Sequence, residues 1–187
     1  MHSDLWHSMR STGPITVGVV ACGEEKLSHA TPAKHLYSSR HFQLCRAYVR
    51  QRCEAWCILS AKHRVLHPNE VIEPYNERVS GGARQIGKPG FWHHRTAHEL
   101  RSIFSTEERP VHFYVLCGTT YRAVFDRWGA DCRLFAGDGG VAYPLKSLGI
   151  GEQDAWLMEQ TKYRGHGGPS HRASGQQRRA PAAVSTA

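Results

Sequence analysis

The run Ile15–Cys22, ITVGVVAC, decides the fold class. It is uncharged, rich in β-branched residues and followed by Gly23, a pattern typical of a strand buried on both faces of a sheet. Two later runs have the same character, Trp56–Leu59 (WCIL) and Val111–Cys117 (VHFYVLC). We therefore expect three central strands, each followed directly by a glycine or a small polar residue.

Segments with apolar residues at helical spacing separate these strands. They begin after Ser39, extend over Phe91–Phe104, begin again at a Thr119 or Thr120 cap, and recur around Glu152–Gln160. The inward-facing positions of the first three are Phe42, Cys45, Tyr48 and Val49; Ala97, Leu100, Ile103 and Phe104; and Tyr121, Val124, Phe125 and Trp128.

Strands that alternate with helices favour a parallel sheet with right-handed crossovers and helices on both faces. We expect an α/β fold, a small Rossmann-like three-layer sandwich with a mostly parallel sheet of about four strands. Cys132–Phe135 is the candidate fourth strand, and a Gly-rich turn, 136–140, follows it. Residues 62–90 are rich in Pro and Gly and predict a long, largely irregular loop that is functional or disordered.

Composition limits the class of protein. The chain has 187 residues, 40% hydrophobic and 21% charged, which excludes a wholly disordered chain, a collagen-like repeat and a coiled coil. We expect a flexible N-terminus over residues 1–13, a single α/β domain over 14–162 and a disordered basic tail over 163–187. The formal charge is +8, and from Lys162 onward there are five cations and no acid.

Location and cysteine chemistry are read from the same sequence. The first 13 residues lack the charged and apolar regions of a secretory signal, and no apolar run approaches the roughly 20 residues of a membrane helix. We therefore expect a cytoplasmic protein without a membrane partner, whose thiols stay reduced. The six cysteines lack zinc-finger spacing, since Cys53 and Cys57 have no second pair. Most of them read as buried free thiols.

No metal or cofactor is expected. His94 and His98 lie four residues apart on a predicted helix, but no HExxH pattern or third ligand accompanies them. The chain also lacks the glycine-rich phosphate-binding and dinucleotide-binding motifs.

Ligands of an open parallel sheet bind beyond the carboxyl ends of its strands. Three segments follow the predicted strand ends: 22–26 (CGEEK), 60–63 (SAKH) and 117–122 (CGTTYR). If the strands are parallel, these segments converge on one rim. The candidate substrate-binding residues are Cys22, Gly23, Lys26, Tyr37, Ser60, Tyr75, Gly118, Thr119, Tyr121 and Arg122.

The residue types suggest roles. Lys26 and Lys62 carry compact charges suited to a phosphate, although either is also compatible with a solvated loop lysine. His63 is a candidate general acid or base, with an ordinary pKa near neutrality. Glu73 is a candidate carboxylate for stabilising an oxocarbenium ion, unless Tyr75 and its neighbours anchor this loop while its acids face water. The three candidate catalytic residues are Lys62, His63 and Glu73.

The segment that begins at Gly118 leads into a predicted helix, so its free backbone N–H groups are suited to an anion. A simple helix cap at Thr119 is the alternative, and for this segment taken alone it is the favoured explanation.

The chain resembles an uncharacterised bacterial and phage family of unknown function that is distantly similar to the YaaA-type peroxide-stress proteins. The resemblance spans roughly residues 17–157 and rests on a CGxxK-type motif at 22–26, a SAKHG-type motif at 60–63 and the Pro-Tyr pair at 74–75. It implies an α/β domain linked to nucleic acid or nucleotide metabolism, without a settled reaction. The family pattern has Gly where this chain has Arg64, so a left-handed turn there would be strained.

Three function classes remain. The first is an enzyme acting on a nucleotide, or on a base within nucleic acid, by N-glycosidic hydrolysis or transfer. The alternative is a non-catalytic DNA- or RNA-binding protein that uses its basic tail. The third is a stress role through Cys22 or Cys117, because both are predicted at strand ends, where a thiol pKa is readily lowered.

Overall fold

The computed structural model describes residues 13–79, 90–104, 109–126 and 140–162. Its main sheet has five strands in the order β4-β3-β1-β6-β7. The bounds are β1 (Ile15–Ala21), β3 (Ala55–Ser60), β4 (Arg64–Leu66), β6 (Val111–Leu116) and β7 (Gly140–Ala142). All neighbours run parallel except β4, which is antiparallel to β3. The three central strands are therefore those that the sequence predicts.

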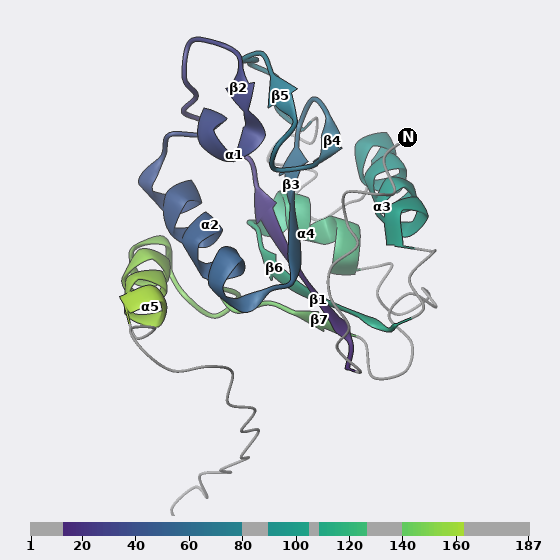
Figure 1. The fold of residues 1–187 in the computed structure, drawn as a ribbon, viewed down its shortest axis with the longest axis vertical. Coiled ribbons are helices and arrows are strands. Elements are labelled where there is room, and N and C mark those ends of the chain that lie inside the picture. The colour runs from purple at the N-terminus through teal and green to yellow at the C-terminus, as the bar shows by residue number, and fades with distance from the viewer. Residues whose placement is uncertain (1–12, 80–89, 105–108, 127–139, 163–187) are drawn as a thin grey trace, which may run out of the picture.

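Helices cover both faces of this sheet (Figure 1). The helices are α1 (Ala33–Leu36), α2 (Arg40–Arg52), α3 (Phe91–Phe104), α4 (Thr119–Asp126) and α5 (Ile150–Lys162). Side chains of β1 alternate: Val17 and Val19 pack with α3 and α4, whereas Val20 packs with α1, α2 and α5. Each face buries its own apolar cluster, as the period of two in a strand requires.

The capping prediction holds at one helix and is wrong at the other. The Ser39 hydroxyl accepts a hydrogen bond from the backbone N–H of Phe42 at 3.4 Å, which caps α2 as predicted. In α4 the first backbone bond runs from Arg122 N–H to the carbonyl of Gly118, at 2.9 Å. Gly118 therefore holds the capping position, and Thr119 is already helical.

Short strands were missed in the segment predicted as a long irregular loop. It contains β4 and β5 (Val71–Ile72), and β5 pairs with β2 (Thr31–Pro32) in a second, two-stranded sheet. Strands of two or three residues are too short for a periodic pattern to reveal them. Gly140, predicted in a turn, pairs with β6 as the first residue of β7.

Several expectations concern residues outside the described ranges. They are the flexible segment at 1–12, the candidate strand Cys132–Phe135, the helix position Trp128 and the tail over 163–187. Within the described part of the chain, no helix has the length and apolar character needed to cross a membrane.

Gly18 permits the closest approach between the sheet and a helix. A Cβ atom added at Gly18 would lie 2.5 Å from Cβ and 2.6 Å from Cγ1 of Val49 on α2. These atoms are anchored close to the helix backbone, so the contact cannot be relieved by rotating a side chain. Gly18→Ala should therefore lower the free energy of unfolding by about 3 kcal/mol, at the upper end of overpacking costs.

The matched control is Gly118→Ala, because a Cβ added at Gly118 would meet no atom within 4 Å. It should lower the free energy of unfolding by no more than about 1 kcal/mol, the cost of alanine at an N-cap, and so by much less than Gly18→Ala. Urea unfolding measures both variants. Equal effects of the two substitutions would contradict the packing argument.

Arg64 adopts the left-handed backbone conformation that favours glycine. Its φ is 63°, and it is the one non-glycine residue with a positive φ in the described ranges. Arg64 Nε donates to Oε2 of Glu99 at 2.8 Å, which ties the start of β4 to α3. The turn after β3 is therefore left-handed at this residue, and the arginine bears conformational strain.

Comparing Arg64→Gly with Arg64→Ala isolates this strain, since both variants lose the contact with Glu99. Only glycine adopts a positive φ without steric cost, so the glycine variant should be more stable than the alanine variant by about 1 kcal/mol. Thermal and urea unfolding report the difference. If the two variants unfold at the same midpoint, Arg64 carries no backbone strain.

Candidate functional site

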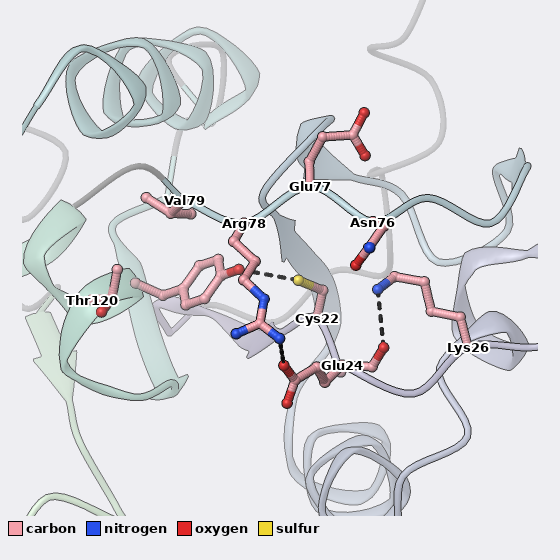
Figure 2. A pocket seen from close by; sticks show the side chains of 10 residues that line it. Cys22, Glu24, Lys26, Asn76, Glu77, Arg78, Val79 and Thr120 are labelled. Carbon is pink, nitrogen blue, oxygen red and sulfur yellow. Dashed lines mark hydrogen bonds and ion pairs between the residues drawn. The ribbon is translucent and has the colours of Figure 1, made fainter. Parts of the chain in front are cut away.

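A cavity of about 240 Å³ opens at the carboxyl ends of β1 and β6. It is lined by three segments that lie far apart in the sequence: 22–26, 76–79 and the start of α4. Figure 2 shows these segments around Cys22. The lining residues are Cys22, Gly23, Glu24, Lys26, Asn76, Glu77, Arg78, Val79, Thr120 and Tyr121.

The buried hydroxyl groups of Ser60, Tyr75 and Tyr37 form a chain of hydrogen bonds that supports segment 76–79. Oγ of Ser60 accepts the backbone N–H groups of Lys62, at 3.2 Å, and of His63, at 3.0 Å. With both lone pairs occupied, the serine O–H donates to the hydroxyl of Tyr75 at 2.7 Å. Tyr75 in turn lies 2.8 Å from the hydroxyl of Tyr37. Burial raises the pKa of both phenols, so they stay protonated and keep the chain intact.

Both lysines that follow strand ends lie against the ring of Tyr75. Nζ of Lys26 is 4.5 Å from the ring centroid, and Nζ of Lys62 is 5.8 Å from it. Lys62 also forms an ion pair with Glu77, at 3.5 Å between Nζ and Oε1. In the described part of the chain Lys26 has no acidic partner, and its ammonium donates to the carbonyl of Glu24 at 3.2 Å. An anionic ligand would therefore find an ammonium available beside an aromatic face.

Two further contacts join opposite walls of the cavity. The thiol of Cys22 lies 3.2 Å from the hydroxyl of Tyr121, which connects β1 to α4. The guanidinium of Arg78 forms an ion pair with the carboxylate of Glu24, and both side chains are exposed. In Figure 2 this pair joins segments 22–26 and 76–79, while the Glu77 carboxylate points away from Cys22.

His93 fixes the wall that α4 contributes. Its Nδ1 accepts the backbone N–H of Gly90 at 3.0 Å, so the proton is on Nε2, which donates to the carbonyl of Thr120 at 2.9 Å. The side chain is buried, and Trp92 beside it packs edge-on against Tyr121. The start of α3 therefore holds the start of α4 in place.

The structure brings most of the sequence-predicted residues to this region, at different depths. Cys22, Gly23, Lys26 and Tyr121 line the cavity, and Gly118 and Thr119 begin the helix that forms one wall. Tyr37, Ser60 and Tyr75 are buried in the hydroxyl chain instead. Since Ser60 is 0% exposed and Tyr37 1%, neither offers a surface to a substrate, and both act as supports.

Four further predicted residues, Lys62, His63, Glu73 and Arg122, do not line the cavity. His63 packs edge-on against the ring of Tyr75, with centroids 5.4 Å apart, and its buried Nε2 has no partner among the described residues. Desolvation, followed by the Lys62 charge, lowers the pKa of His63, so its imidazole is neutral at pH 7. Arg122 lies over the ring of Tyr143, at 5.6 Å.

Glu73 is exposed, whereas Ile72 and Tyr75 on either side are buried. These two residues anchor the loop and turn Glu73 to water, the alternative that the sequence left open.

Sequence reasoning missed the cavity residues of segment 76–79. No strand end precedes this segment, so nothing in the pattern placed Arg78 or Val79 at the rim. Glu24 and Thr120 lie inside segments that the sequence did single out, and only their neighbours were selected. Glu24 and Glu77, rather than Glu73, are the carboxylate residues that line the cavity.

A second constellation, between α2 and α5, has the outline of a nucleophile with its base. Nε2 of His41 lies 3.5 Å from Sγ of Cys45, and Nδ1 lies 2.6 Å from Oδ1 of Asp154. Cys45 is fully buried, however, and burial raises its pKa to about 12. The thiol is inert at neutral pH, so this group joins two helices.

No group of three or more His, Cys, Asp or Glu side chains gathers at metal-binding positions in the ranges that the structure describes. His94 and His98 accordingly gain no third ligand there.

Comparisons with known proteins place this arrangement among proteins of unknown role. The model of a family of unknown function, DUF6884, matches residues 17–159, from β1 to α5. The chain is also similar to an uncharacterised protein of Bacillus subtilis (strain 168), YfjM. They are 30% identical over 142 residues, which cover 71% of this chain and 86% of YfjM. No solved structure matches.

Cysteine reactivity tests the description of the site. Burial raises the pKa of Cys45 and Cys57 to about 12 and that of Cys117 well above its usual value, so they hold almost no thiolate at pH 8. Cys22 is partly exposed on the cavity wall. Iodoacetamide at pH 8 should therefore label Cys22 at least about 100-fold faster than those three.

Peptide mass spectrometry assigns the label to each cysteine, and labelling in urea shows that every thiol reacts once the chain unfolds. Equal rates at Cys22 and Cys117 in the folded protein would contradict this account and restore Cys117 as a redox candidate.

Proposed function

The chain belongs to the family of unknown function DUF6884, and from that premise we propose that it is an enzyme that cleaves or transfers an N-glycosidic bond of a nucleotide or of a base in nucleic acid. The observation behind the proposal is the cavity itself. It places the carboxylate of Glu24, the ammonium of Lys26 and the aromatic side chain of Tyr121 around a space of about 240 Å³.

The size and lining of the cavity favour a small planar group attached to an anion. Its volume lies just below the roughly 300–1,000 Å³ of sites for drug-sized ligands, so it suits one nucleotide unit rather than an extended ligand. Lys26 would neutralise a phosphate, whereas Lys62 lies outside the lining and is paired with Glu77. The side chains of Asn76 and Tyr121 offer hydrogen bonds to a base or sugar.

Hydrolysis at this site would consume one water molecule. The bond between the sugar C1′ and the base nitrogen breaks, and the water oxygen bonds to C1′. One water proton passes through the Glu24 carboxylate and finishes on the departing nitrogen. The carboxylate also opposes the positive charge that develops on the sugar ring, and the Lys26 ammonium holds the anionic part of the substrate.

The topology supports this placement. The chain passes from β1 to β3 on one side and returns to β6 on the other, so the strand order reverses beside β1. We infer that the fold is a Rossmann-like three-layer sandwich with its site at this reversal. A distant kinship with the YaaA-type proteins remains part of the proposal.

Base release tests the proposed reaction. Nucleosides, nucleotides and DNA with modified bases are incubated with the protein, and free base is measured by chromatography. Glu24→Gln should lower kcat at least about 100-fold, the usual size of a lost acid–base group. Lys26→Gln should mainly raise KM.

Glu73→Gln is the matched control, because it removes an exposed carboxylate of the same rim loop outside the cavity. It should leave base release unchanged. If no substrate releases a base, or if Glu24→Gln equals Glu73→Gln, the glycosidic proposal fails. Nucleic-acid binding without base release, lost on removal of residues 164–187 but kept in Lys26→Gln, would favour the non-catalytic alternative.

A further inference from the structure

A cluster of positive side chains lies on α1 and α2, outside the site already described. Its members, here called the α1–α2 basic cluster, are Lys34, His35, Arg46 and Arg50. One guanidinium nitrogen of Arg46 donates to the carbonyl of Lys34, and the same nitrogen lies 3.4 Å from Nδ1 of His35. Arg46 and Arg50 are four residues apart on α2, so they occupy the same helix face.

No acid among the described residues forms an ion pair with this cluster. In the part of the chain that the structure describes, none of its cations forms an ion pair, and Lys34 donates instead to the amide oxygen of Asn69 at 2.7 Å. Desolvation, followed by the positive charges of the other three members, lowers the pKa of His35. Arg46 and Arg50 are like charges four residues apart on one helix, and such a pair destabilises a helix by about 0.2–0.5 kcal/mol. Folding alone therefore does not favour this pair.

The cluster belongs to the same structural unit as the cavity. Backbone hydrogen bonds pair the cavity segment with the end of α1: Leu27 N–H donates to Leu36, and Ser38 N–H to Glu25. Tyr37, directly after α1, ends the hydroxyl chain below the cavity. In Figure 1, α1 lies between α2 and the small sheet of β2 and β5.

We propose that the α1–α2 basic cluster binds the phosphate backbone of a nucleic acid, so that the base presented to the cavity belongs to a polymer rather than to a free nucleotide. The choice of substrate rests on the proposed function of the cavity, whereas binding by this surface is independent of it. Arginine and lysine contacts to phosphates supply sequence-independent affinity and hold a strand in position.

The surroundings of the cluster favour nucleic acid over a membrane. An anionic membrane needs apolar side chains beside the charges for firm attachment. Among the described residues of α1, α2, β2 and β5, Val71 is the one large hydrophobic side chain that is exposed. Guanidinium groups that bond phosphate oxygens are the usual protein contribution to a nucleic-acid backbone.

Salt-dependent binding of the full chain tests the proposal. The affinity for a fluorescent DNA duplex and for its single strand is measured across a series of salt concentrations. The Lys34→Gln/Arg50→Gln variant should bind more weakly, and the slope of log K against log salt should fall by about 0.9 per lost contact with duplex. The basic tail is present in every protein compared, so its contribution cancels.

Arg50→Gln is also measured alone, with Arg95→Gln as its matched control, since both residues are exposed arginines on helices and α3 covers the opposite face of the sheet. Arg95→Gln should leave the slope unchanged, and thermal unfolding confirms that each variant is folded. The proposal is overturned by absence of binding at low salt, by equal slopes for all variants, or by an equal loss in Arg95→Gln. Binding to phosphatidylserine vesicles but not to DNA or RNA also overturns it.

The two experiments distinguish failure of the proposed glycosidic reaction from failure of nucleic-acid binding by the α1–α2 basic cluster. If base release is absent but the double variant still loses nucleic-acid affinity, the surface stands and the glycosidic reaction falls. If base is released from free nucleosides by wild type and double variant alike, and wild type binds no nucleic acid, the reaction stands and the surface falls.

Discussion

The rim of this protein depends on one buried hydroxyl, that of Ser60. A serine placed fully inside a protein needs hydrogen bonds to offset its lost hydration. Here two backbone N–H groups and Tyr75 satisfy it. These hydrogen bonds shape the turn after β3 and hold Tyr75 in place. Segment 76–79 follows Tyr75 directly and therefore lies at the end of β1. Without that anchor, one wall of the cavity would lack its attachment to the sheet.

The hydrogen bond between Ser60 and Tyr75 also fixes the positions of two charged side chains. Because the Tyr75 ring is fixed, Lys26 and Lys62 have a common surface against which their ammonium groups lie. One of them is paired with Glu77, and the other forms no ion pair within the described chain. The result is an asymmetric site in which an anion finds one cation free and another partly neutralised.

Two positions, Gly18 and Arg64, show how closely the fold restricts the backbone. Gly18 admits Val49 at a distance that no other residue permits, which sets the position of α2 against β1. Arg64 has a left-handed backbone conformation that favours glycine, and its guanidinium contacts Glu99. At both positions the fold sets the backbone conformation, and the residue present must be compatible with it.

By itself, the sequence determined the central strands, the amphipathic helices and the convergence of segments at one rim, because those follow from periodicity and from the rule for parallel strands. It could not determine which polar residues of the rim face inward. Only tertiary structure turned Ser60 and Tyr37 into the interior, turned Glu73 to water and placed Glu24 at the cavity. The path of a loop is fixed by contacts with residues far away in the sequence, here the hydrogen bonds of Tyr75 with the hydroxyls of Tyr37 and Ser60. The local sequence pattern does not indicate such contacts.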